Sequence, residues 1–390
     1  MMPAMHPVYL DNNATTPVDP EVYEAMTPFL KEEYGNASSA HERGQRARKA
    51  VEESRSQVAE LLGCPEREVM FTSGGTEADN LAVWGLAMRY RDRGTHIVTT
   101  KIEHPAVLRT CEVLESDGFQ VTYLDAGSDG IVSPDDVAQA TREDTILVSV
   151  MYVNNETGAI QPLSEIAAVA RKKGALVHTD AVQAAGKIPV DVRQLGVDLL
   201  SISAHKLHGP KGVGALLVKE GVEVVPWMLG GSHERGRRGG TENVPGIVGL
   251  GKACSVANRR LGEFKSVIGG LRDRLEEGIL ESIPGTHVNG SRSARAPHVT
   301  NISFDDIGGE ALLVALDFQG VAVSTGAACA AGSISLSHVL SAMSISEERI
   351  KGAIRFSLGR FTDAGDIDYV LQILPDLVER AREAAPETAD

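Results

Sequence analysis

Residues Val197–Val218, which read VDLLSISAHKLHGPKGVGALLV, decide the fold. Two apolar segments, Val197–Ile202 and Val213–Val218, flank a short loop that contains Lys206 together with serine and histidine residues. Apolar runs of this length with glycine nearby are typical of strands buried inside a sheet. Lys206 is therefore expected at the end of a core strand, where burial lowers the pKa of an amine and prepares it to form a Schiff base. The alternative is a lysine whose amine reaches solvent from a turn.

Two segments upstream supply partners for this amine. Val69–Thr72 is predicted to be a strand, and the glycine turn and helix start that follow it contain Gly75 and Thr76. A helix N-terminus after such a turn presents free N–H groups and the positive end of the helix dipole to an anion. Asp180 comes at the end of another predicted strand. A phosphate site, a carboxylate and an amine are the three groups that pyridoxal phosphate requires, so this order along the chain favours that cofactor.

The composition is that of an acidic globular protein. The chain has 390 residues, of which 42% are hydrophobic and 23% charged, and its formal net charge is −15. This length predicts one large and one small domain, and the acidity argues against nucleic acid as a partner. Because no apolar run is long enough for a membrane helix and no secretory pattern is present, we expect a cytoplasmic protein without a membrane partner. Four widely spaced cysteines predict free thiols and no metal site: Cys64, Cys111, Cys254 and Cys329.

Apolar strands alternate with helical patterns in the first two thirds of the chain. The expected strands are Val69–Thr72, His96–Thr100, Gln120–Leu124, Ile146–Met151, Ala175–Thr179, Leu199–Ser203 and Val213–Val218. This alternation predicts an α/β domain with a mainly parallel, seven-stranded sheet wrapped by helices, with ligands at the carboxyl ends of the strands. The last two strands flank the short Lys206 loop, so one antiparallel pair is expected there.

The rest of the chain predicts a smaller α+β domain. Its expected elements are strands at Thr300–Phe304 and Val321–Ser324 and helices at Glu310–Gln319 and Asp366–Ala384, reached through a long helical stretch at about Asn243–Ile279. We assign residues 15–260 to the large, cofactor-binding domain, and residues 1–14 and 261–390 to the small domain.

Several motifs follow one another along the chain: YLDNNATTP, FTSGGTEADN, EHPAV, VNNETG, HTDAVQAAGK, SAHKLHGPKGVGAL, HERGRRGGTEN, STGAACAAGS and IRFSLGR. Together they resemble the cysteine desulfurases of the NifS/IscS type, which are class V, fold-type I pyridoxal-phosphate enzymes. The resemblance extends from Tyr9 to about Tyr369. It implies a homodimer that converts L-cysteine to L-alanine, holds the sulfur as a persulfide, and supplies an iron–sulfur scaffold protein or another sulfur acceptor.

The resemblance also assigns roles around the cofactor. Lys206 would form the Schiff base and move protons between the substrate and the cofactor, and Asp180 would keep the ring nitrogen protonated. His104 would stack on the ring and act as an acid or base near the substrate thiol; the alternative is a histidine that only starts a helix. Asn155 and Gln183 would hydrogen-bond the ring oxygen or position the substrate, although lone amides are more often turn or surface residues.

The remaining binding residues implied by the resemblance hold charged groups. The phosphate would be bound by Gly75, Thr76, Ser203 and His205, and by Thr241 of the second subunit. Thr241 belongs to the glycine- and arginine-rich stretch Gly230–Asn243, which would otherwise be a solvated surface loop. Arg355 alternates with apolar residues, and its planar guanidinium would bind the substrate carboxylate. A structural ion pair is the alternative for this arginine.

Cys329 decides the reaction that the resemblance implies. Its surroundings, STGAACAAGSISLS, are small residues that we expect to form a mobile loop, which would let a thiolate collect and deliver sulfur; the alternative is a small buried residue. The proline and acidic residue that often follow this cysteine in the family are missing, and Ala327, Ala330 and Ala331 replace hydroxyl residues. Other functions stay open: a selenocysteine lyase, another class V aminotransferase or lyase, or a sulfur-carrier protein with a vestigial cofactor site.

Overall fold

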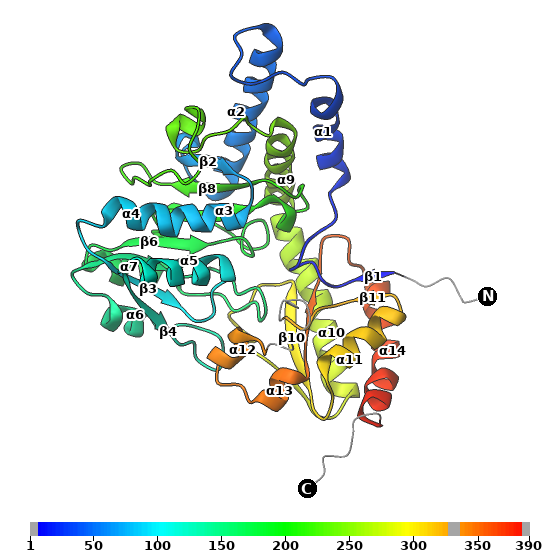
Figure 1. Cartoon of the computed structure of the whole chain (residues 1–390). Helices are drawn as coiled ribbons and strands as arrows, with labels where there is room; N and C mark the ends of the chain where they lie inside the picture. Colours follow the sequence, from blue (N-terminus) through cyan, green and yellow to red (C-terminus); the bar gives the residue numbers. More distant parts are fainter. Residues whose placement is uncertain (1–6, 327–335, 384–390) are drawn as a thin grey trace.

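A seven-stranded sheet forms the centre of the larger part of the molecule (Figure 1). The computed structural model describes residues 7–326 and 336–383. In spatial order the strands are β2 (Val69–Thr72), β8 (Gly214–Val218), β7 (Leu199–Ser203), β6 (Leu176–Asp180), β5 (Thr145–Ser149), β3 (His96–Thr100) and β4 (Gln120–Leu124). The pairs from β7 to β4 are parallel, whereas β8 runs antiparallel to both of its neighbours. The predicted α/β fold is confirmed.

The central sheet differs from the prediction at the end of β5 and in the pairing of β8. Beyond Ser149 the pairing with β3 does not continue, because the N–H of Met151 donates to the buried Glu103 carboxylate at 2.9 Å, whereas the N–H of Tyr152 still donates to the carbonyl of Asp180 in β6 at 2.9 Å. The strand β8 has a second antiparallel neighbour, β2, which the expectation of a single antiparallel pair missed. Sequence distance hides this pairing, since β2 and β8 are separated by five other strands of the sheet.

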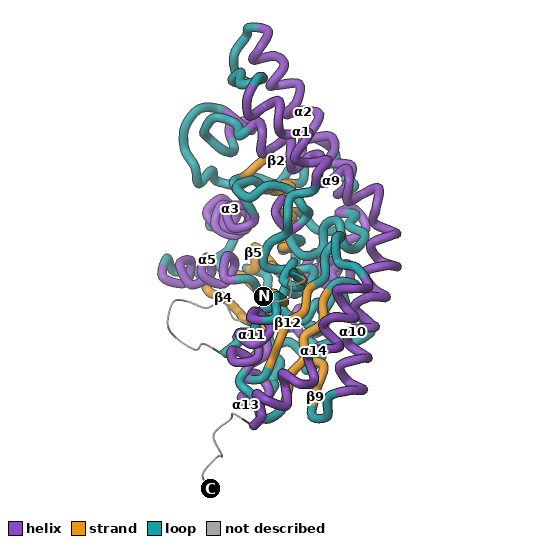
Figure 2. The backbone as a smooth tube through the Cα atoms, turned by 90° about the vertical axis from the view of Figure 1, so that its right-hand side faces the viewer, coloured by secondary structure: helices purple, strands orange, loops and turns teal. Residues whose placement is uncertain are grey.

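Side chains of the strands alternate between two hydrophobic cores, as expected for a sheet covered on both faces. In β2, Val69 and Phe71 share a core with the helices α2 (Glu42–Leu62) and α9 (Val244–Glu263). Met70 points the other way, into the core that contains α5 (Pro105–Ser116). Figure 2 shows these helices on opposite sides of the strands. Polar side chains also occur within the strands, where they pair with one another: His178 of β6 lies 2.9 Å from Ser149 Oγ and 3.1 Å from Ser201 Oγ.

The smaller part of the molecule contains an antiparallel sheet in the order β12 (Ala353–Ser357), β10 (Val299–Phe304) and β9 (Thr286–Val288). Its separate core includes residues of α10 (Gly269–Ser282), α11 (Gly309–Phe318) and α14 (Ala364–Glu383). Val8 and Leu10 pack in this core, which supports, as a proposal, the assignment of residues 1–14 and 261–390 to one domain. Within the described ranges, no helix is both long and apolar enough to span a bilayer.

The N-terminal segment connects the two parts of the molecule. It begins with β1 (Val8–Tyr9), which pairs in parallel with β11 (Val321–Ala322). The N–H of Asn12 then donates to the carbonyl of Ser357 in β12 at 3.0 Å, and the N–H of Thr16 donates to the carbonyl of His205 at 3.0 Å. The segment therefore lies between the small sheet and the loop that carries Lys206, before α1 (Pro20–Lys31) starts.

Candidate active site

A cavity of about 400 Å³ lies at the carboxyl ends of the central strands. Its volume falls within the range of roughly 300–1,000 Å³ that is usual for small-molecule sites, and its position is where α/β sheets bind ligands. Predicted residues that line it are Gly75, Thr76, His104, Asn155, Asp180, Gln183, Ser203, His205, Lys206 and Arg355. The structure thus brings these residues together from distant parts of the chain.

Lys206 follows β7 in a short 3-10 turn and lines the cavity. Its Nζ donates to the carbonyl of Ala14 at 2.8 Å and to the carbonyl of Asn13. Burial is the main cause that lowers the pKa of Lys206 to about 8, and the nearby Arg355 charge acts in the same direction. At neutral pH an amine with this pKa is neutral roughly 300-fold more often than an ordinary lysine. Lys206 therefore has the environment of a nucleophilic amine.

Asp180 ends β6 and is buried at the cavity wall. Its Oδ1 accepts the N–H of Val182 at 2.8 Å. Burial raises the pKa of Asp180, whereas the neighbouring His104 and Lys206 lower it. A second cavity residue, the buried Asp79, has its pKa raised well above the usual value by burial and then by Asp180. Asp180 has His104 and Lys206 as neighbours that favour its ionised form, so it is the carboxylate suited to partner a protonated ring nitrogen.

His104 starts a helix and also reaches the cavity. It is the N-cap of α5, and its Nδ1 accepts the N–H of Ala106 at 3.1 Å. It also lines the cavity. Burial lowers the pKa of His104, which favours the neutral ring. Since Nδ1 accepts a hydrogen bond, the proton of the neutral ring is on Nε2, where a bound molecule could receive it.

The anion-binding corner is built by the turn after β2. Gly75 starts α3 (Gly75–Asn80), which continues through a π-helical turn into α4 (Leu86–Tyr90). A Cβ added at Gly75 would lie 3.0 Å from the Val182 side chain, so the backbone approaches its neighbours closely here. His205 completes this corner as a neutral donor, because burial and the nearby Lys206 lower the pKa of His205 to about 4. Free N–H groups, a buried carboxylate and a lysine with a lowered pKa fit pyridoxal phosphate.

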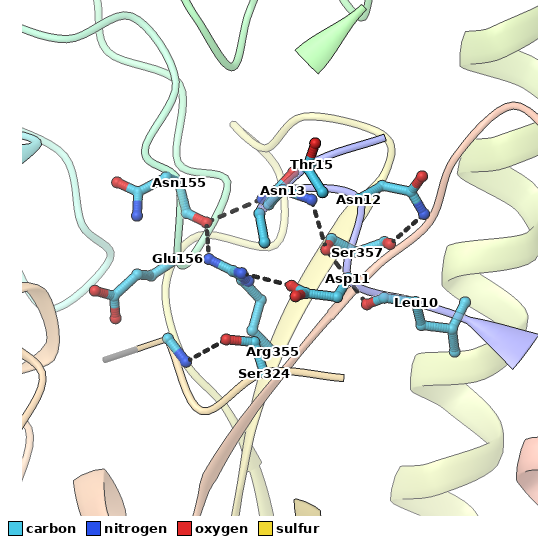
Figure 3. A network of polar contacts seen from close by, with 12 residues as sticks. Leu10, Asp11, Asn12, Asn13, Thr15, Asn155, Glu156, Ser324, Arg355 and Ser357 are labelled. Carbon is cyan, nitrogen blue, oxygen red and sulfur yellow. Dashed lines mark hydrogen bonds and ion pairs between the residues drawn. The ribbon is translucent and has the colours of Figure 1, made fainter. Parts of the chain in front are cut away.

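Arg355 forms the structural ion pair that the sequence suggested as an alternative to substrate binding. In β12, its Nη2 is 2.7 Å from Asp11 Oδ1 and its Nη1 donates to the carbonyl of Asn155 at 3.0 Å (Figure 3). Its Nε is buried and has no hydrogen-bond partner among the residues that the structure describes. The guanidinium also lines the cavity. The structure therefore contains both features: a structural ion pair, and a cation at the wall of the site.

The side-chain amide of Gln183 is hydrogen-bonded within the protein, although its predicted role is to bind the cofactor or position the substrate. Its Nε2 donates to the carbonyl of Asn13 at 2.9 Å, and its Oε1 accepts from the buried Lys187 amine at 2.5 Å. Both ends of this amide are thus engaged within the protein. Asn155 differs, because its backbone carbonyl accepts from Arg355 Nη1 and from Asn13 Nδ2 at 2.9 Å, which leaves its side-chain amide at the cavity. Of the two amides, Asn155 is the better placed to meet a bound molecule.

Thr241 lines a separate cavity of about 120 Å³ in this chain. The stretch Gly230–Asn243 is anchored, because the Glu234 carboxylate accepts from Arg55 Nη1 at 2.8 Å and from Arg55 Nη2 at 3.0 Å. Glu234 is also buried against the sheet, where it accepts the N–H of Phe71 at 3.0 Å. The stretch is therefore no simple solvated loop. The role of Thr241 toward a second subunit stays a prediction.

Several cavity residues were missed from the sequence. They are Asn13, Ala14, Asp79, Met151, Val182, Ser324 and Gly326. The segment DNNATTP was interpreted as turn chemistry, although its polar residues precede the first helix within a motif that carried the resemblance. Cys329 lies outside the described residues. Within the described part of the chain, no cluster of His, Cys, Asp and Glu forms a metal site.

Comparison with known proteins identifies the family. Residues 8–370 match the family described as aminotransferase class-V. A cysteine desulfurase IscS from Methanosarcina thermophila is 49% identical over 381 residues, which are 98% of this chain and 94% of the relative. The chain belongs to the cysteine desulfurases of the class-V aminotransferase family. A second cysteine desulfurase IscS, from Dictyoglomus turgidum, is 48% identical and covers 97% of this chain and 96% of its own.

Solved structures of the family agree with this assignment. A NifS-like protein superposes with a TM-score of 0.91 at 40% identity, covering 96% of this chain and 100% of that chain. SspA in complex with cysteine superposes with a TM-score of 0.81 at 36% identity, covering 91% of this chain and 100% of that chain. The family is pyridoxal-phosphate dependent, so the predicted family, fold type and cofactor are confirmed.

Proposed function

We propose that this chain is a pyridoxal-phosphate-dependent cysteine desulfurase that converts L-cysteine to L-alanine and transfers the sulfur to Cys329. One observation carries the proposal: a single cavity joins the Lys206 amine, whose pKa is about 8, to the buried Asp180 carboxylate and the Arg355 guanidinium. The reaction balances without an external oxidant. The Cβ–S bond of cysteine breaks, an S–S bond forms with the Cys329 thiolate, and Cβ receives the electron pair and a proton.

The residues of the cavity would hold the cofactor and the substrate by their charges. Those expected to bind the phosphate, the ring nitrogen and the aldehyde carbon are Gly75, Thr76, Ser203, His205, Asp180 and Lys206. When bound, pyridoxal phosphate supplies a carbonyl that condenses with amines and a ring that accepts electrons from the substrate Cα. The structure of SspA with cysteine supports an amino acid with a thiol as the substrate of this chain.

Protein groups perform the proton transfers. The lowered pKa lets Lys206 exist as a free amine that removes the proton from Cα and later returns one. His104 would hold a proton at Nε2 for exchange near the substrate sulfur, since its Nδ1 is engaged with the backbone. Arg355 would bind the substrate carboxylate, with the buried Nε as an available donor.

The proposal extends to assembly and to the fate of the sulfur. We propose a cytoplasmic homodimer in which Thr241 of each subunit reaches the phosphate of the other. The anchored stretch Gly230–Asn243 supports this, as do the exposed apolar side chains of Trp227 and Leu229 just before it. The sulfur would pass as a persulfide to an iron–sulfur scaffold or another acceptor, as the IscS name of the relatives suggests.

The decisive experiment is incubation of the purified protein with pyridoxal phosphate and then with L-cysteine. We expect a yellow protein that forms L-alanine and, with a thiol reductant, sulfide in equal amounts. Alanine formation that requires a 2-oxo acid would identify an aminotransferase instead, and activity with selenocysteine alone would identify a selenocysteine lyase. A protein that stays colourless with the cofactor would contradict the proposal.

The pH dependence of cofactor binding follows from the pKa of Lys206. Only the neutral amine attacks an aldehyde, and its fraction increases as the pH rises through about 8. The rate at which the cofactor-free protein forms its absorption band should therefore rise between pH 7 and pH 9 and then level off. Stopped-flow absorbance measures it, with free Nα-acetyl-lysine as the control amine, whose rate keeps rising to roughly pH 10. A protein rate that follows the control would refute the lowered pKa.

Replacing Arg355 with lysine should weaken substrate binding. Lysine keeps the charge but cannot form the paired hydrogen bonds of a guanidinium. Loss of about 1.5–3 kcal/mol for one charged hydrogen bond corresponds to an increase of KM for cysteine of roughly 10–100-fold. Steady-state kinetics measure it, and the matched control is Arg274→Lys, which changes an exposed arginine of the small domain. Equal KM values for the two variants would remove Arg355 from the substrate site.

A further inference from the structure

We propose that Asn13 is a positioning residue that holds both the Lys206 amine and the Arg355 guanidinium in the orientation that the reaction needs. The functional roles of Lys206 and Arg355 rest on the proposed function, whereas the contacts of Asn13 are observed in the structure. Asn13 lies between β1 and α1 and is 2% exposed. A buried amide in a turn must satisfy its polar atoms, so its partners define what it does.

The side chain of Asn13 is fixed by one donor and one acceptor. Its Nδ2 donates to the carbonyl of Asn155 at 2.9 Å, and its Oδ1 is 2.8 Å from Nε2 of His298. Burial lowers the pKa of His298 well below its usual value, so the ring is neutral. The His298 Nδ1 has no partner among the described residues, which places the ring proton on Nε2, facing Oδ1. This arrangement requires an amide; a carboxylate would have no proton for Asn155.

The backbone of Asn13 presents its carbonyl to the catalytic amine. Its N–H donates to Ser357 Oγ at 3.0 Å, which ties the turn to β12. Its carbonyl accepts from Gln183 Nε2 at 2.9 Å and also from Lys206 Nζ, while the next carbonyl, that of Ala14, accepts from the same amine at 2.8 Å. Because the turn is held on both sides, two carbonyls stay aimed at one nitrogen.

The same turn also reaches the carboxylate side of the cavity. The carbonyl of Asn155 accepts from Asn13 Nδ2 and from Arg355 Nη1 together (Figure 3). Asp11, two residues before Asn13, holds the other terminal nitrogen of Arg355 at 2.7 Å. A substrate amino acid must meet the amine at its α-carbon and the guanidinium at its carboxylate. The turn therefore fixes the distance between the Lys206 amine and the Arg355 guanidinium, which would bind the same small molecule.

Asn12 offers a matched control in the same turn. It is almost as buried as Asn13, and its Nδ2 donates to the carbonyl of Ser357 at 3.0 Å and to that of Tyr9 at 3.2 Å. These contacts stabilise the turn against β1 and β12, and none of them involves Lys206 or Asn155. Truncating either asparagine removes buried hydrogen bonds, but only Asn13 connects to the cavity.

The first measurement uses the holoenzyme and L-alanine, the product, as the probe. Binding is followed by the change in the cofactor absorption spectrum. Asn13→Ala should weaken L-alanine binding by about 5–10-fold, the value of one net hydrogen bond, and should shift the pH at which the cofactor band changes. Asn12→Ala should do neither. Asn13→Asp, which keeps the shape but lacks the donor, should weaken binding as the alanine variant does, and it decides the matter if Asn13→Ala does not fold.

The second measurement uses the cofactor-free full chain, so it does not depend on the proposed function. Acetic anhydride labels amines, and mass spectrometry of the Lys206 peptide gives its rate relative to exposed lysines. The two carbonyl acceptors stabilise the protonated, unreactive form of the Lys206 amine, so Asn13→Ala, which loosens the turn that presents them, should label about 5–10-fold faster than the wild type and Asn12→Ala. If the Asn13 variants match Asn12→Ala in both measurements, Asn13 has no positioning role. If the wild type shows no cofactor band, the proposed function fails, and labelling still decides the role of Asn13.

Discussion

Replacing Lys206 with alanine is expected to lower the rate of L-alanine formation from L-cysteine by a factor on the order of 10³ or more. The amine is proposed to serve twice, as the group that binds the cofactor covalently and as the proton carrier at Cα. Proton transfer by a positioned side chain alone contributes about 10²–10⁴-fold. The pKa of about 8 and the two carbonyl acceptors describe an amine prepared for both tasks. The measurement is turnover at saturating cysteine and cofactor.

A covalent label identifies the amine independently of turnover. Borohydride reduction of the wild type should fix the cofactor on the peptide that contains Lys206. The alternative amine is Lys187, which is buried nearby and whose pKa is lowered well below its usual value by burial. Lys211→Ala, in the same loop but exposed, should keep wild-type turnover. A label on the Lys187 peptide, or a Lys206→Ala enzyme with more than about a tenth of the activity, would contradict the assignment.

Replacing Cys329 with alanine is expected to abolish sulfur transfer while leaving cofactor binding intact. The three described cysteines are poor candidates for the sulfur acceptor. Burial raises the pKa of Cys64 and of Cys111 to about 12 and raises that of Cys254 as well. A thiol with so high a pKa supplies almost no thiolate at neutral pH, and the thiolate is the nucleophile. Sequence and chemistry together therefore leave Cys329 as the proposed acceptor.

Mass spectrometry of the chain after brief exposure to L-cysteine tests this directly. The wild type should gain the mass of one sulfur atom on the Cys329 peptide, and Cys329→Ala should gain none. The variant should still change the cofactor absorption when cysteine is added, because the cavity residues are unchanged. Cys64→Ala is the control and should retain sulfur transfer. Normal sulfide release by Cys329→Ala, or a persulfide on another peptide, would overturn the proposal.

The parts of the molecule that could be predicted from the sequence are those whose side-chain types form a recognisable pattern. Buried strands read as apolar runs, so the positions of Asp180 and Lys206 at strand ends followed from hydrophobicity alone. Asn13 and Ala14 were missed because their carbonyls make the contacts with Lys206, and a backbone carbonyl is present in every residue. Asn and Asp are also common in turns for local reasons, which concealed the role of Asn13.

Long-range pairing explains the remaining differences. The ion pair between Asp11 and Arg355 joins residues 344 positions apart, and no local pattern predicts such a contact. The second antiparallel neighbour of β8 is hidden in the same way, since strands that follow one another in sequence usually pair, and β2 and β8 are far apart along the chain. The proposed role of Thr241 concerns a second subunit, so one chain describes only its own half of the proposed contact.

The course of the N-terminal segment has a consequence for biosynthesis. Residues 8–16 are synthesised long before their partners at Ser357 and Arg355, since Asp11 precedes Arg355 by 344 positions. The central sheet contains no strand later than Val218, so it can assemble while these early residues still wait. The substrate site should therefore become complete late in folding, in a final step that joins residues far apart in sequence.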